Sequence, residues 1–71
     1  MMFIKIDARF IDSRSKPHRT VYSVAIPAKT IEEAERAVIE GVAFSMKKNG
    51  NKLLKLNAIE TDINTYLKLA Q

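Results

Sequence analysis

Two stretches in the first third of the chain alternate apolar and polar side chains. From Phe3 to Ile11, apolar residues alternate with Lys5, Asp7 and Arg9, and a second alternating stretch runs from about Thr20 to Ile26. A period of two is typical of a β-strand with one buried face. Both stretches are therefore predicted strands.

The segment between these strands is polar and contains Pro17. It runs from Asp12 to Thr20, which is longer than the tight two-residue turns of many hairpins. We predict a hairpin loop here. After Asp12 it carries no further acid, and its cationic or titratable side chains are Arg14, Lys16, His18 and Arg19.

A capped helix follows the second strand. Pro27 removes a backbone donor where the strand should stop, and Thr30 and Glu33 stand at the positions of a capping box. Apolar and small residues then recur at helical spacing from Ile31 to about Lys48, which predicts a helix laid on a sheet. Because Gly41 falls on this stripe, we expect a close approach of helix and sheet there.

A third strand is predicted from Lys52 to Ile59, after the helix ends at Asn49-Gly50-Asn51. The alternation places Leu54, Leu56 and Ala58 toward the helix and Leu53 away from it.

The C-terminal segment allows two interpretations. Thr61 or Asp62 can cap a short helix, whereas alternation beyond Ile63 also fits a fourth strand. We favour the helix. Its shared apolar side would consist of Ile63, Tyr66, Leu67 and Ala70.

These elements predict an α+β fold of the order β-β-α-β. The sheet has three antiparallel strands in the order 2-1-3, one long helix covers one face, and a short C-terminal helix or fourth strand follows. The second face of this sheet is more apolar than a solvated face usually is. We expect the C-terminal segment to fold over it, in preference to a second copy or a partner.

The length and composition predict one cytoplasmic domain over residues 1–71. The chain has 71 residues and no cysteine, so it has neither a disulfide framework nor a thiolate metal site. No apolar run approaches the roughly 20 residues that span a bilayer, and charges follow the first four residues at once. We therefore expect a soluble protein that does not associate with membranes.

The net charge of +4 favours an anionic partner, although a modest excess is also common in small soluble domains. The length of the helix and that of the second strand roughly match, so the helix should end near the hairpin loop. Candidate contact residues at this shared end are Arg14, Lys16, His18, Arg19, Lys47, Lys48 and Lys52. The alternative is that a loop and a helix C-terminus simply tolerate cations.

Catalytic motifs are not found in the sequence. His18 is the single histidine, and there is no glycine-rich phosphate loop, metal-ligand spacing or plausible triad. We therefore expect a non-enzyme without a cofactor or metal. No aromatic residue interleaves with the cations, which argues against base stacking, and no recognition-helix pair indicates sequence-specific DNA reading.

The run from Ser23 to Val38, with a strand on either side, resembles the core of small phage-encoded inhibitors. Bacteriophage T7's inhibitor of host RNA polymerase and some type I anti-CRISPR proteins share such a strand, helix start and further strand. The resemblance covers about half of the chain and implies occlusion of a nucleic-acid-handling machine. The same joint also resembles the antitoxin of the HicA/HicB system, but the extra strand and glycine-rich turn of that antitoxin are missing here.

Three functional hypotheses result. The first is a phage or mobile-element protein that inhibits a host protein or ribonucleoprotein complex through the basic end. The second is a module that binds nucleic acid directly. The third is an antitoxin-like or homodimeric subunit that associates through the open sheet face.

Overall fold

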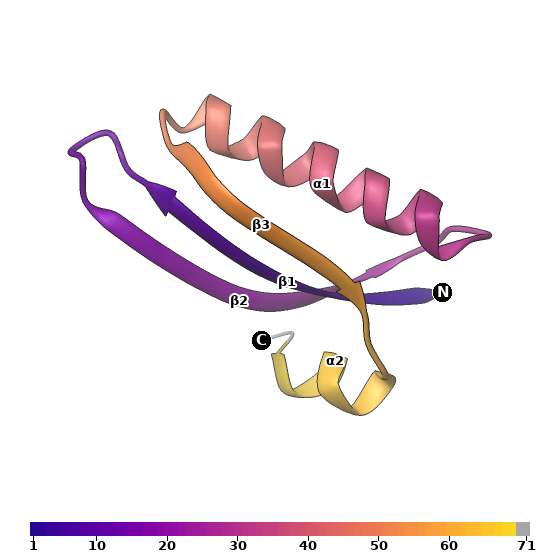
Figure 1. Ribbon diagram of the computed structural model, residues 1–71. Helices are drawn as coiled ribbons and strands as arrows, with labels where there is room; N and C mark the ends of the chain where they lie inside the picture. Colours follow the sequence, from indigo (N-terminus) through magenta and orange to yellow (C-terminus); the bar gives the residue numbers. More distant parts are fainter. Residues whose placement is uncertain (70–71) are drawn as a thin grey trace.

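The computed structural model describes residues 1–69 (Figure 1). Three strands and two helices follow one another along the chain. They are β1 (Met2–Ile11), β2 (Pro17–Ile26), α1 (Ile31–Lys48), β3 (Lys52–Glu60) and α2 (Ile63–Leu69). The predicted helix from Ile31 to Lys48 is confirmed at both ends.

The strands form a single antiparallel sheet in the order β2-β1-β3. The predicted α+β class, strand order and short C-terminal helix are therefore confirmed. The two helices lie on opposite faces of this sheet (Figure 1), with α1 over β1 and β3 and α2 beneath β2 and β1.

The core forms where the central strand meets α1. Ile4 and Ile6 of β1 are almost fully buried, as is Ala34 of α1. The period of two in β1 and the period of 3.6 in α1 bring these apolar side chains into one layer. Among residues 1–69, the buried apolar residues are Ile4, Ile6, Ala8, Ala34, Val38 and Val42.

Both ends of α1 are held by local hydrogen bonds. The Thr30 hydroxyl accepts the N–H of Glu33 at 3.2 Å, as the capping box predicts, but the Glu33 carboxylate accepts the N–H of Lys29 at 3.4 Å rather than that of Thr30. At the other end, Gly50 has a φ of 72°. Its N–H and that of Asn51 donate to the carbonyls of Lys47 and Met46, the two bonds of a Schellman motif.

A β-bulge in β3 reverses the predicted facing of Leu53 and Leu54, whereas Leu56 and Ala58 pack against the core as predicted. Arg9 pairs with Lys55 and Phe10 pairs with Leu53, so Leu54 is an additional residue with no partner on β1. Leu53 packs against the core, whereas Leu54 is 54% exposed. The expectation that Leu54 faces the helix is wrong because strict alternation does not allow for an inserted residue.

The hairpin loop is shorter than predicted, because β2 begins at Pro17 instead of near Thr20. The loop is confined to residues 12–16, and His18 and Arg19 are strand residues. As strand residues, neighbouring His18 and Arg19 point to opposite faces of the sheet.

The expected close approach at Gly41 is also wrong. A Cβ atom added to Gly41 would meet nothing within 4 Å, and the residue is exposed. Because α1 lies over β1 and β3 and leaves β2 largely uncovered, Gly41 borders a groove between α1 and β2.

Helix α2 covers one end of the second sheet face, as expected for the C-terminal segment. Asp62 caps it by accepting the N–H of Thr65 at 2.7 Å. The Tyr66 ring lies 4.9 Å from that of Phe3, and the buried Ser23 hydroxyl donates to the Tyr66 carbonyl at 3.0 Å.

The predicted apolar side of α2 is only partly correct. Tyr66 packs on the sheet, but Ile63 and Leu67 are 53% and 62% exposed. The helix instead rests on Thr65, Tyr66 and Leu69, all half-buried. Ala70, the fourth residue of the predicted side, lies outside the described residues.

The bulge makes a testable distinction between two adjacent leucines. We expect Leu53→Ala to lower the free energy of unfolding by about 1–2 kcal/mol, because it removes half-buried apolar contacts. Leu54→Ala should change it by less than about 0.5 kcal/mol, as is usual for exposed positions. Urea denaturation of both variants measures the difference, and equal losses would contradict the bulge.

Candidate functional site

The hairpin loop and the α1–β3 turn lie side by side at one end of the molecule (Figure 1). A Cβ atom on Gly50 would lie 3.8 Å from the Cβ of Ser13, and Ile11 pairs directly with Lys52. The matched helix and strand lengths predicted this juxtaposition. We call this end the hairpin end, and its cations are Arg14, Lys16, Lys47, Lys48 and Lys52.

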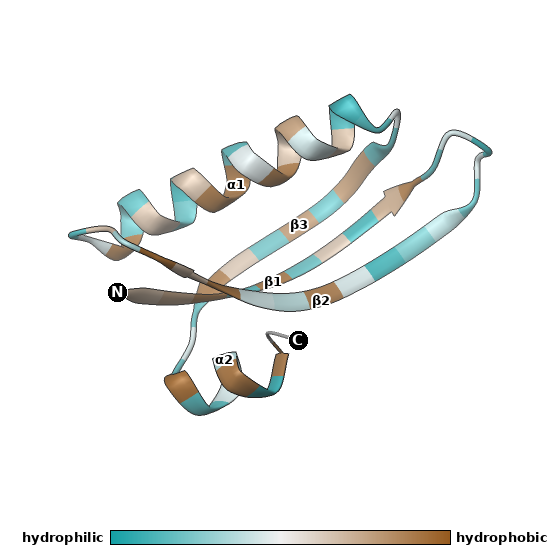
Figure 2. Ribbon diagram, turned by 180° about the vertical axis from the view of Figure 1, so that it is seen from behind, coloured by the Kyte–Doolittle hydropathy of each residue, from teal (hydrophilic) through white to brown (hydrophobic). Residues whose placement is uncertain are grey.

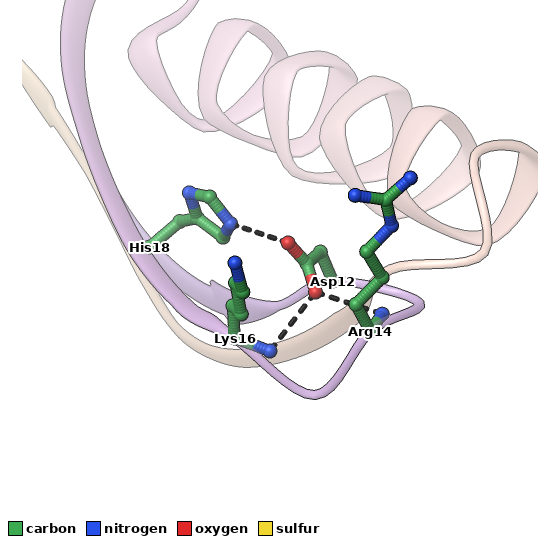
Figure 3. Close-up of polar contacts among 4 residues, drawn as sticks. All are labelled: Asp12, Arg14, Lys16 and His18. Carbon is green, nitrogen blue, oxygen red and sulfur yellow. Dashed lines mark hydrogen bonds and ion pairs between the residues drawn. The ribbon is translucent and has the colours of Figure 1, made fainter.

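Asp12 organises the hairpin loop (Figure 3). Its Oδ1 accepts the N–H of Arg14 at 2.8 Å and that of Lys16 at 2.9 Å, and its Oδ2 lies 2.7 Å from His18 Nε2. The Lys16 backbone N–H, followed by the His18 side chain, lowers the pKa of the Asp12 carboxyl below its ordinary value of 3.8. The Asp12 carboxylate thus fixes the conformation of the loop that carries Arg14 and Lys16.

His18 has an acidic partner in Asp12 of the same hairpin. The His18 ring also stacks on Phe10, with ring centres 5.1 Å apart. Asp12 bonds the loop amides through its other oxygen, so the pair stabilises the loop conformation. His18 lies on the α1 side of the sheet with Phe10, away from the face that carries Arg19.

The sheet face opposite α1 carries a row of three cations. Arg9 on the central strand pairs with Arg19 on β2 and with Lys55 on β3. Side chains directly opposite each other on neighbouring strands share a face, so the three lie across the sheet in one line. Lys52 precedes this row, toward the hairpin end, and Lys5 follows it. We call this surface the basic sheet face, with the cations Lys5, Arg9, Arg19, Lys52 and Lys55.

The basic sheet face joins the hairpin end through Lys52 and extends away from it along the sheet. Of its five cations, sequence reasoning had selected Arg19 and Lys52 and missed Lys5, Arg9 and Lys55. The alternation in β1 already placed Lys5 and Arg9 opposite the buried isoleucines. The position of Lys55 beside Arg9 depends on the register between β1 and β3, which the sequence alone does not specify.

Asp7 lies among these cations and fixes one of them. Arg19 donates from Nε to Oδ1 at 3.1 Å and from Nη2 to Oδ2 at 2.8 Å, a bidentate pair. This hydrogen bonding lowers the pKa of Asp7 and raises that of Arg19. The charges of Arg9 and Lys5 lower the pKa of Asp7 further.

Two hollows lie on this face. One of about 40 Å³ is lined by Asp7, Arg9, Lys55 and Asn57, and a second of about 300 Å³ is lined by Lys5, Asp7, Asn57 and Ile59. Buried small-molecule pockets are lined mostly by apolar residues, whereas charged and amide residues predominate in both of these linings. This surface is therefore better suited to an extended anionic partner than to an enclosed cofactor.

Among residues 1–69, no group of three or more histidine, cysteine, aspartate or glutamate side chains could hold a metal ion. Within the same residues, neither helix is both long enough and apolar enough to cross a membrane.

Comparison of the chain with protein-family models, with curated proteins and with solved structures finds no match. The resemblance to phage-encoded inhibitors and to an antitoxin therefore stays a prediction.

The Asp7–Arg19 pair can be tested by titration. We expect Arg19→Gln to raise the pKa of the Asp7 carboxyl toward 3.8, because it removes the largest stabilising contact of the ionised form. Arg36→Gln, an exposed change on α1, should leave it unaltered. Carboxyl NMR titration of both variants measures the shift.

The same pair makes stability depend on pH. Because the folded-state pKa of Asp7 is lowered from 3.8, its contribution is present above about pH 3.8 and is lost as the pH falls through the folded-state value. Arg19→Gln should weaken this acid dependence. An Asp7 pKa that is the same in wild type and Arg19→Gln would show that the ion pair does not form in solution.

Proposed function

We propose that this chain is a non-catalytic binding protein that contacts the phosphate groups of a nucleic acid. The observation that supports this most directly is the row of Arg9, Arg19 and Lys55, which are exposed on the part of the sheet face that α2 does not cover. The row continues through Lys52 to the cations of the hairpin end. Together they form a basic surface of the kind that neutralises phosphates and releases counterions.

The geometry of the row favours contact with a backbone over base reading. Strands are about 4.8 Å apart, so three neighbouring cations span about 10 Å of surface. On the same face, the neighbours of the row along the strands are Asp7, Val21 and Asn57 on one side and Ile11, Pro17 and Lys52 on the other, none of which is aromatic. Phosphate contacts position a protein on nucleic acid without specifying sequence, so we propose binding with little sequence preference.

A second candidate is an acidic protein surface of a host nucleic-acid-processing complex. This candidate fits the inhibitor hypothesis that the sequence resemblance raised. Val21 and Ile59, 38% and 56% exposed, lie on the same sheet face as the cations. Apolar side chains beside charges are common in protein–protein interfaces, whereas they would make no specific contact with a phosphate backbone. Either candidate is compatible with a cytoplasmic protein.

The experiment compares two variants of equal net charge. Arg9→Gln/Lys55→Gln removes two cations of the row, and Lys29→Gln/Arg36→Gln removes two exposed cations near the start of α1. Fluorescence anisotropy with a labelled duplex and a labelled single strand, over a range of salt concentrations, gives the slope of log K against log salt. The row variant should lose about two phosphate contacts. Each lost contact should lower the magnitude of the slope by roughly 0.9 on the duplex and roughly 0.7 on the single strand.

The matched variant should retain the wild-type slope. A third variant, Arg14→Gln/Lys16→Gln, tests whether the hairpin end contributes. Equal binding by the row variant and the wild type would refute the assignment of this face. If the wild type binds neither probe, but is retained on immobilised polyglutamate through Arg9 and Lys55, the acidic-protein candidate is favoured.

A further inference from the structure

The outer edge of the sheet at β2 is unprotected over half of its length. Pro17, His18 and Arg19 shield the half near the hairpin, but residues 22–26 carry no charge, proline or bulge. Folded proteins usually block such an edge, because its free N–H and C=O groups pair readily with another strand. The opposite edge, β3, has the bulge at Leu54 and several charged side chains.

An apolar groove of about 240 Å³ runs along this same half of β2. The groove exists because α1 lies over β1 and β3, so that the α1-side face of β2 is left open. Figure 2 shows that hydrophobic residues gather where β2 leads to α1, whereas the hairpin end is hydrophilic. The strand wall of the groove is formed by Tyr22, Val24 and Ile26, and the helix wall by Ala37, Gly41 and Ser45.

The opposite side of β2 is occupied by α2. The Ser23 hydroxyl donates to the Tyr66 carbonyl, so α2 contacts this half of β2 on the face opposite α1 and leaves its edge free. A strand added to the edge would place alternate side chains in the groove and the others on the α2 side. The added strand therefore needs apolar side chains at the alternate positions that enter the groove. At the positions between them it needs small side chains, because α2 lies on that face.

We propose that the occupant is a second copy of this chain, paired antiparallel through β2. The segment 22–26 has the required pattern, because Tyr22, Val24 and Ile26 alternate with the small Ser23 and Ala25. A two-fold axis normal to the sheet, near Ser23 or Val24, pairs residues of the same face and satisfies both edges in one contact. Such an isologous interface is the commonest form of homodimer.

Charge complementarity favours a second copy over an unrelated strand. In the antiparallel arrangement, the hairpin half of each β2 runs past the Pro27 joint of the other copy, toward the first turns of its α1. The hairpin loop carries Arg14 and Lys16, whereas residues 29–36, around the start of α1, carry the three glutamates Glu32, Glu33 and Glu35 against Lys29 and Arg36. The two ends that come together therefore differ in the sign of their net charge, and the two rows of Arg9, Arg19 and Lys55 stay apart.

The proposed dimer has a continuous six-stranded sheet with two basic sheet faces, one on each side of the axis. This inference does not depend on the ligand of those faces. It differs from association through the open sheet face, since the contact is the β2 edge and the apolar groove.

The test uses a substitution that should preserve the fold. Gly41→Lys places a long charged side chain at the groove, where an added Cβ meets open space, and lysine is a better helix former than glycine. Ala43→Lys adds the same charge at an exposed position of α1 that does not line the groove. Circular dichroism checks that both variants fold.

Sedimentation from micromolar to millimolar concentration gives the dimer dissociation constant. We expect a concentration-dependent dimer for the wild type and for Ala43→Lys, and at least about tenfold weaker association for Gly41→Lys. Amide hydrogen exchange of the wild type should slow at the outward N–H groups of residues 22–26 as concentration rises.

Two results would overturn the proposal. One is a wild type that stays monomeric throughout, which would leave the β2 edge for a strand of another protein. The other is a dimer that Gly41→Lys does not weaken or that leaves the β2 amides unprotected, which would place the interface elsewhere. Nucleic-acid binding by the row of Arg9, Arg19 and Lys55 is measured separately, so failure of the dimer proposal leaves that assignment intact.

Discussion

The central strand is the element on which the rest of this small protein depends. Ile4 and Ile6 of β1 are buried against α1. The residues that alternate with them, Lys5, Asp7 and Arg9, point to the opposite face of the sheet. Hydrophobic burial of one set therefore fixes the orientation of the other set, which includes Arg9. A chain of 71 residues buries a small core and has little stability in reserve. The same contacts that stabilise the fold also orient the basic sheet face.

The fold was largely predictable because its signals are local. The alternation in β1, the Thr30 cap and the Gly50 turn each act within a few residues, and all three are present in the structure. What was mispredicted depends on how elements pair. The inserted Leu54 and the open space beside Gly41 follow from the pairing of β3 with β1 and from the position of α1 over the sheet, and neither is encoded in a periodic pattern.

The candidate site shows the same division between local and long-range information. The sequence correctly predicts that the hairpin loop and the turn after α1 lie together with their cations, but it places Arg19 in the hairpin loop. In the structure Arg19 is a strand residue held by Asp7, twelve positions away along the chain. Its alignment with Arg9 and Lys55 is a property of strand register. Charge along the sequence therefore gave the sign of the surface but not its location.

The bulge at Leu54 has a consequence for how this chain should be compared with any other. Lys52 and Lys55 are three residues apart, an odd separation that would put them on opposite faces of a regular strand. The inserted residue restores them to one face, and it keeps Leu53 in the core. A relative that lacked this single residue would keep the same inward leucine and outward lysines in a regular strand. An alignment of β3 across its relatives must therefore allow a one-residue gap at this point, because a match made without gaps would exchange the two faces.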